Sequence, residues 1–201
     1  YTRPHNKQST EFTYARFLVP WLTGYKGMAI FMDCDMLMLG DIAELVKYRP
    51  VGPVACVKHD YTPSTTTKFL GQQQTNYPKK NWSSVMVFNC AHPCCHKLMP
   101  ETVNNMTGKW LHQFEWAIGV EELPSEWNYL VGEGQDVKDP KLIHYTIGGP
   151  WFDEYSDCEY SQEWFDERER ATGLPNVRGK GVFEIEIEGH THSKSASGGS
   201  T

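Results

Sequence analysis

The stretch that decides the fold is Ile30-Phe31-Met32-Asp33-Cys34-Asp35-Met36. An apolar run over residues 27–32 predicts a buried strand of the parallel type that ends at Asp33. Side chains two residues apart in a strand face the same side, so Asp33 and Asp35 present two carboxylates together. Such carboxylates repel each other unless a cation or a proton lies between them. The motif therefore predicts a divalent-metal site at the end of a strand, where open α/β sheets bind ligands.

Two other interpretations of this pair stay open. In one, Asp33 caps a turn and Asp35 is solvated. In the other, the chain is a phosphatase of the haloacid-dehalogenase type, which also places Asp-x-Asp after an apolar strand. Those enzymes continue with Thr or Val where this chain has Leu37, which weakens that interpretation. A metal held by one or two carboxylates usually completes its shell with substrate phosphates, so a nucleotide diphosphate is the natural partner.

Elements expected on either side of the motif alternate between helix and strand. Helices are predicted over 10–22, 41–46, 93–99, 110–118 and 161–171, and strands over 27–32, 51–57, 83–88 and 142–145. This alternation is typical of an α/β fold, with helices flanking a mixed, mostly parallel sheet.

Length and composition restrict the function classes. The 201 residues predict one domain, and the 39% hydrophobic and 22% charged residues are ordinary for a globular protein. A net charge of −6 without a long Lys/Arg cluster argues against a nucleic-acid partner. No run reaches the roughly 18 to 20 apolar residues of a membrane span, and no apolar leader is visible, so a cytoplasmic location is expected. Six scattered cysteines predict free thiols, and zinc at residues 90–96 is a minor alternative.

Six segments of the chain resemble, in order and approximate spacing across residues 12–152, the core of family 8 glycosyltransferases, the group of glycogenin and bacterial lipopolysaccharide galactosyltransferases. They are Tyr14-x-Arg16-Phe17-x-x-Pro20, Ile30-Phe31-Met32-Asp33-Cys34-Asp35, Gly40-Asp41-Ile42-x-Glu44-Leu45, Ser84-Val85-Met86-Val87-Phe88-Asn89, Leu123-Pro124-x-x-Trp127-Asn128 and Ile143-His144-Tyr145-Thr146.

The resemblance implies a GT-A fold and hexosyl transfer with retention from a nucleotide-diphosphate sugar, first of all a UDP-sugar, to an unidentified sugar or glycan acceptor. It implies that Asp33, Asp35 and His144 hold Mn²⁺ or Mg²⁺, and the imidazole would favour Mn²⁺. It also implies that Arg16 contacts the donor, as the bidentate anion recognition of arginine suits. The alternatives are a structural His144 and a surface salt bridge at Arg16.

The chain departs from the family pattern at two places. After the His strand the family has Gly-x-x-Lys-Pro-Trp, whereas this chain reads Gly148-Gly149-Pro150-Trp151 and lacks the Lys. Backbone N–H groups of Gly148 and Gly149 could approach a phosphate instead, or Lys68 or Lys141 could replace the missing cation. Aromatic residues such as Trp151 and Trp127 could line a sugar, although core packing is the more frequent use.

The second departure concerns the family's Asp-Gln-Asp segment, which lies by the reacting sugar. Residues 111–116 occupy its place without copying it, and Glu115 is the catalytic candidate there, as nucleophile or stabiliser. In the alternative interpretation, Phe114 and Trp116 pack in the core and Glu115 is solvated.

The beginning and end of the chain lead to a prediction about its domains. Residues 1–175 are expected to form a catalytic domain that lacks its first strand, so the sheet should have an open position beside residues 27–32 and be poorly stable. Residues 176–201 are expected to form an extension with a short strand at 182–188 and a disordered tail. This incompleteness leaves a third function open, a non-catalytic protein that binds nucleotide-sugar or carbohydrate.

Overall fold

The computed structural model of the chain describes residues 1–3, 12–60 and 78–175. The strands in these ranges are β1 (Met28–Met32), β2 (Met36–Met38), β3 (Val54–Cys56), β4 (Val85–Asn89), β5 (Glu121–Glu122), β6 (Tyr129–Leu130) and β7 (Leu142–His144). The α-helices are α1 (Phe12–Ala15), α2 (Val19–Leu22), α3 (Ile42–Val46), α4 (Pro100–Asn105), α5 (Gly108–His112) and α6 (Ser161–Thr172). Short 3₁₀ segments are η1 (Arg16–Leu18), η3 (Trp82–Ser84), η4 (Pro93–Lys97), η5 (Ser125–Trp127) and η6 (Asp153–Tyr155).

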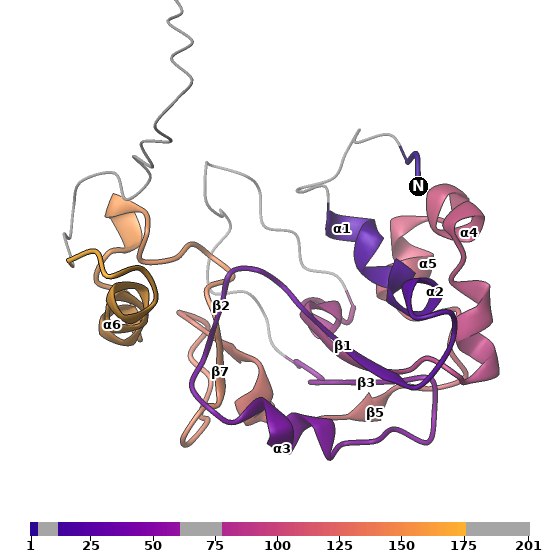
Figure 1. The fold of residues 1–201 in the computed structure, drawn as a ribbon, viewed down its shortest axis with the longest axis horizontal. Helices are drawn as coiled ribbons and strands as arrows, with labels where there is room; N and C mark the ends of the chain where they lie inside the picture. The colour runs from indigo at the N-terminus through magenta and orange to yellow at the C-terminus, as the bar shows by residue number, and fades with distance from the viewer. Residues whose placement is uncertain (4–11, 61–77, 176–201) are drawn as a thin grey trace, which may run out of the picture.

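The strands form two sheets, with strand orders β1-β4-β3-β5 and β2-β7-β6 (Figure 1). The pairs β1–β4, β3–β4 and β2–β7 are antiparallel, while β3–β5 and β6–β7 are parallel. The predicted mixed α/β fold is therefore confirmed, but the prediction of a mostly parallel sheet is wrong in the described residues. An apolar run such as Met28–Met32 shows that a strand is buried and does not show the direction of its neighbour.

The four-stranded sheet is covered on both faces, because alternate side chains of its strands enter two different core clusters. On β4, Met86 and Phe88 pack with Phe17 and Trp116, whereas Val85 and Val87 pack with Leu45 of α3 and with Trp127. Figure 1 shows α1, α2, α4 and α5 together on one side of this sheet, with α3 on the other. Two core clusters, one on each face, thus hold the four-stranded sheet in place.

The Asp-x-Asp segment lies between the two sheets, where β1 ends at Met32 and β2 begins at Met36. The backbone N–H of Asp33 donates to the Ser84 carbonyl at 3.0 Å, beside β4. The backbone carbonyl of Asp35 accepts from the Tyr145 N–H at 3.0 Å, directly after β7. The two aspartates therefore belong to a short connection, rather than to one strand as the i, i+2 argument assumed.

Other elements differ from the prediction mainly in length. The helix expected over 10–22 is broken into α1, η1 and α2, and the helix expected over 110–118 ends early, with Phe114 at φ 57°. The segment at 93–99 is largely 3₁₀ and contains η4. Asp41 caps α3 as expected, accepting from the Ala43 N–H at 2.9 Å, and α6 matches its prediction closely.

Strand β1 lies at an edge of its sheet, so within the described ranges no strand occupies its other side. The extension at 176–201, with its predicted strand at 182–188, lies outside the described residues. None of the described helices is long and apolar enough to cross a lipid bilayer. All six cysteines are free thiols, as expected.

Candidate active site

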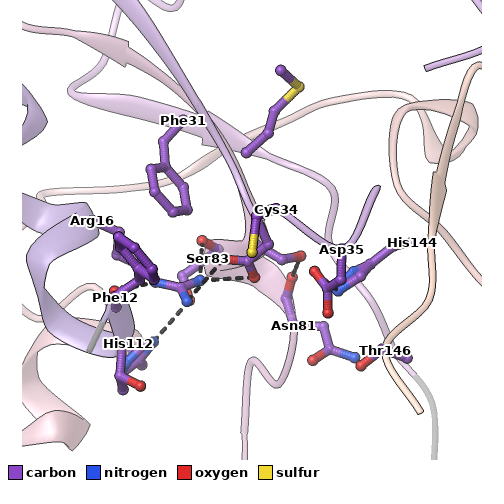
Figure 2. A pocket seen from close by; sticks show the side chains of 14 residues that line it. Phe12, Arg16, Phe31, Cys34, Asp35, Asn81, Ser83, His112, His144 and Thr146 are labelled. Carbon is purple, nitrogen blue, oxygen red and sulfur yellow. Dashed lines mark hydrogen bonds and ion pairs between the residues drawn. The ribbon is translucent and has the colours of Figure 1, made fainter. Parts of the chain in front are cut away.

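A cavity of about 460 Å³ opens where the Asp-x-Asp segment meets the two sheets (Figure 2). Figure 2 shows Asp35, His144 and Thr146 at one end of the cavity and Phe12, Arg16 and His112 at the other, with Cys34 and Ser83 between them. The first end is called the carboxylate end below, and the second the Arg16 end. Five separate parts of the sequence thus meet in one place.

The carboxylate end brings together the three residues predicted to hold a metal. One ligand atom each from Asp33, Asp35 and His144 lie within 4.8 Å of one another. Among the described residues this is the one group of three metal-binding side chains that lie this close together. The minor alternative of zinc at residues 90–96 is therefore unsupported. Imidazole with two carboxylates is a donor set that suits Mn²⁺ better than Mg²⁺.

Asp35 and His144 face each other at the carboxylate end of the cavity. His144 is 3% exposed at the end of β7, and its Nε2 lies 3.4 Å from Asp35 Oδ1, which is longer than a good hydrogen bond. Asp35 Oδ1 is buried and has no hydrogen-bond partner. Burial alone would raise the Asp35 pKa, but the nearby His144 imidazole lowers it below its usual value. A buried anionic oxygen without a donor is the environment that a cation would satisfy.

Asp33 is held by Arg16 through a two-pronged ion pair. Arg16 Nη2 lies 2.9 Å from Asp33 Oδ1, and Nη1 donates to Asp33 Oδ2 at 3.1 Å and to the Ser83 carbonyl at 3.0 Å. Burial raises the Asp33 pKa, and the Arg16 charge only partly offsets this. The Arg16 side chain is 10% exposed, so the pair is not the surface salt bridge of the alternative interpretation. Arg16 fixes the direction of the Asp33 carboxylate while lining the cavity.

His112 is a cavity residue that the sequence interpretation missed. Its Nδ1 lies 2.8 Å from Ser83 Oγ, and its ring also hydrogen bonds the Thr13 backbone. The ring packs against Tyr14 and Phe17, with centroids 5.7 and 5.1 Å away. Burial, followed by the nearby Arg16 charge, lowers its pKa to about 3, so it is neutral near pH 7. The sequence carries one signal for it, its place in the segment 111–116, where Glu115 is the predicted catalytic residue.

Glu115 does not line the cavity. Its side chain is exposed, while its neighbours Phe114 and Trp116 are 2% and 0% exposed. This is the arrangement of the alternative interpretation, in which the aromatic neighbours pack in the core. A catalytic role for Glu115 stays a prediction that its position does not support.

Gly148 and Gly149 also lie outside the cavity lining, and both are buried. A Cβ atom at Gly148 would overlap the Tyr155 ring, and one at Gly149 would overlap the Trp151 ring. Packing therefore explains the glycine pair, and phosphate contact by its backbone stays an untested prediction.

The other proposed replacements are elsewhere as well. Lys141 pairs with Glu44, with Nζ and Oε2 2.5 Å apart, outside the cavity, and Lys68 lies outside the described residues. Trp127 is fully buried in the core, and Trp151 packs against Tyr145. For these two aromatic residues, core packing describes the structure better than a sugar platform.

Comparisons with known proteins place the fold. No model of a known protein family matches the chain. Among curated proteins, Protein CDI of Arabidopsis thaliana is 48% identical over 174 residues, which are 81% of this chain and 66% of that protein. The chain thus spans just under two thirds of this relative's length.

Two solved structures share the architecture described above. A crystal structure of an active-site mutant of LgtC superposes with a TM-score of 0.51 at 17% identity, covering 87% of this chain and 72% of that one. The glycosyltransferase GlyE of Streptococcus pneumoniae superposes with a TM-score of 0.50 at 14% identity, covering 84% of this chain and 49% of that one. The chain has a family 8-like GT-A glycosyltransferase fold. The predicted resemblance is confirmed at the level of the fold, and in this fold the cavity contains the Asp-x-Asp segment.

Proposed function

We propose that the chain is a metal-dependent hexosyltransferase that moves a sugar, with retention, from a nucleotide-diphosphate donor to a sugar or glycan acceptor. The single observation that carries the proposal is the buried Asp35 Oδ1, which has no hydrogen-bond donor and faces His144 Nε2 at 3.4 Å beside Asp33. The glycosyltransferase fold supports the same reaction class. A UDP-sugar is the first donor to test.

In this proposal, Asp33, Asp35 and His144 hold Mn²⁺ or Mg²⁺. The bound ion supplies a Lewis acid that neutralises charge on the departing diphosphate. The protein's own part is to present these ligands in a fixed arrangement. Arg16 holds the Asp33 carboxylate from the opposite side, and its positive charge lines the cavity in which the donor would bind.

The Ser83–His112 pair, next to Arg16, offers a hydrogen-bonding contact for a hydroxyl group of the donor or acceptor. Ser83 Oγ and His112 Nδ1 form a neutral pair there, and the Ser83 oxygen can accept a hydrogen bond from a sugar hydroxyl. No additional carboxylate lines the described part of the cavity, so we assign no nucleophile. Glu115 as a catalytic group, Gly148 and Gly149 as donor contacts, and a cytoplasmic location stay predictions.

The phosphatase alternative has no support from the fold. An enzyme of that class would use Asp33 to attack a phosphate, whereas this chain shares its fold with LgtC and with the glycosyltransferase GlyE. A panel of phosphate monoesters provides a direct check, since released phosphate would restore that alternative.

The proposal is tested by thermal unfolding with a panel of nucleotide-sugars, each with and without Mn²⁺. A ligand that binds the folded state stabilises it, by about 2.7 kcal/mol at 100 times its Kd. We expect one nucleotide-sugar to raise Tm only when Mn²⁺ is present, and Asp35→Asn to abolish that rise. Donor binding without transfer or donor hydrolysis would identify a non-catalytic binding protein. The absence of any Mn²⁺-dependent shift would contradict the proposal.

A further inference from the structure

Asn128 lies behind His144, away from the cavity, and is fully buried. It follows η5, in the Leu-Pro-x-x-Trp-Asn segment. Its Oδ1 lies 3.1 Å from His144 Nδ1. Its Nδ2 lies 2.8 Å from Ser84 Oγ and 3.4 Å from the Asn81 carbonyl. The amide thus connects the His144 ring to the turn before β4.

The Asn81 carbonyl fixes the direction of each hydrogen bond in the series that runs from it through Ser84 and Asn128 to His144. The Asn81 carbonyl can only accept, and Ser84 Oγ lies 2.6 Å from it, so the Ser84 hydroxyl hydrogen is donated there. Ser84 Oγ can then only accept from Asn128, which places the NH₂ group of the amide toward Ser84. The amide oxygen must therefore face His144.

An acceptor facing Nδ1 requires that Nδ1 carry the hydrogen. In a neutral imidazole the other nitrogen, Nε2, then has a free lone pair, and this is the atom that faces Asp35. The opposite tautomer would point an N–H at Asp35 Oδ1 and close the site with an internal hydrogen bond. It would also turn two acceptors, Nδ1 and the amide oxygen, toward each other.

We propose that Asn128, oriented by Ser84, is a positioning residue that keeps His144 in the tautomer able to bind a metal ion. This inference rests on the proposed metal site and adds a residue to it. Histidine ligands commonly donate their second N–H to an oxygen that fixes the ring.

The experiment reads the tautomer in the metal-free protein by ¹⁵N NMR of the histidine rings at a pH where they are neutral. We expect His144 to carry its hydrogen on Nδ1. His112 is the internal reference, because its Nδ1 accepts from Ser83 and its hydrogen should be on Nε2. Asn128→Leu should shift His144 toward the Nε2–H form and leave His112 unchanged.

Metal affinity gives the second measurement, by calorimetric titration with Mn²⁺ alone. Asn128→Leu should weaken binding by about 10- to 100-fold, the usual effect of losing an outer partner of a ligand. Ser84→Ala should produce a smaller loss, and it serves as the test if Asn128→Leu fails to fold. Asn128→Asp keeps an acceptor for Nδ1–H and should restore most of the affinity.

The outcomes separate this inference from the proposed function. Nε2–H on His144 in the wild-type protein, or unchanged tautomer and Mn²⁺ affinity in both Asn128→Leu and Ser84→Ala, would overturn the role of Asn128. The expected tautomer in a protein that binds no divalent metal would instead contradict the proposed function and leave the orientation of His144 by Asn128 standing.

Discussion

His144 and His112 line the same cavity, yet their hydrogen bonds suit them to opposite tasks. His144 has one ring nitrogen bound to Asn128 and the other directed at a buried carboxylate. His112 has both nitrogens engaged, one by the Ser83 hydroxyl and one by the Thr13 backbone. Residue type, burial and cavity lining do not separate the proposed metal ligand from the packed histidine here. The hydrogen-bond partner of the second ring nitrogen does.

The largest expected effect comes from removing the carboxylate that faces His144. Asp35→Asn should weaken Mn²⁺ binding by at least about 100-fold, beyond the usual loss of an outer partner, while circular dichroism shows an unchanged fold. Glu115→Gln is the matched control, since Glu115 is exposed outside the cavity, and it should bind Mn²⁺ normally. Unchanged Mn²⁺ binding in Asp35→Asn would contradict the proposed metal site. Loss of sugar transfer in Glu115→Gln would support a catalytic role for Glu115.

Truncating each histidine in turn tests whether His144 and His112 have different roles. His144→Ala should weaken Mn²⁺ binding by about 10- to 100-fold and Mg²⁺ binding less, because the softer ion gains more from imidazole. His112→Ala should leave metal affinity unchanged and lower the free energy of unfolding by about 2 kcal/mol. Calorimetry and urea unfolding of both variants provide the measurements. Equal metal affinities in the two variants would show that the hydrogen bonds of the ring nitrogens do not decide which histidine binds the metal.

The stability of the protein should fall in acid because His112 is neutral when folded. Its pKa is lowered to about 3, so between about pH 6.5 and pH 3 the unfolded chain binds a proton that the folded protein does not. Stability is therefore lost as the pH falls through this window. Between pH 7.5 and pH 5, His112 should contribute about 2 kcal/mol of this loss, at about 1.4 kcal/mol per pH unit below 6.5.

His112→Asn removes the titrating group and should reduce that difference, measured by urea unfolding at both pH values. His59, whose pKa burial also lowers to about 3, stays in both proteins and accounts for a remaining acid loss. An identical pH dependence in the variant and the wild type would show that folding does not lower the His112 pKa.

The smallest effect should come from Ser83→Ala, which leaves His112 Nδ1 without its donor. Losing one hydrogen bond to a largely buried group costs about 1 kcal/mol, which urea unfolding can detect. Mn²⁺ affinity should not change, because the Ser83 hydroxyl hydrogen bonds to His112 and not to a proposed metal ligand. A loss of metal affinity would mean that the two ends of the cavity are coupled through Arg16, which also hydrogen bonds the Ser83 carbonyl.

Sequence reasoning found the local parts of this site and missed those that depend on packing. Asp33 and Asp35 follow an apolar run, so a pattern along the chain predicts them, whereas His144 as a ligand is implied by the resemblance to family 8 glycosyltransferases. Glu115 lies outside the cavity that His112 lines, because the backbone turns at Phe114, where φ is 57°. Residues after that turn do not continue the helix face that His112 presents.

The directions of strand pairing and the close contacts of the glycines also depend on tertiary packing, so the sequence alone does not predict them. The run 27–32 carries no mark of an antiparallel neighbour, and the Gly148 and Gly149 pair is explained by rings of Tyr155 and Trp151 that only the fold brings near. Asn128 was recognised as part of a motif, but its bond to His144 crosses 16 positions of the chain and needs the structure.

The connection Asp33 to Asp35 gives the two carboxylates different attachments, since Asp33 is bonded to the backbone before β4 and Asp35 to the backbone after β7. The four-stranded and three-stranded sheets therefore each hold one of them. Any ion that binds both carboxylates would cross-link the sheets at their junction. Binding of the ion should therefore make that junction more rigid. Slower amide hydrogen exchange at the Asp33 and Tyr145 N–H groups, which form these two bonds, would report the ion from the backbone alone.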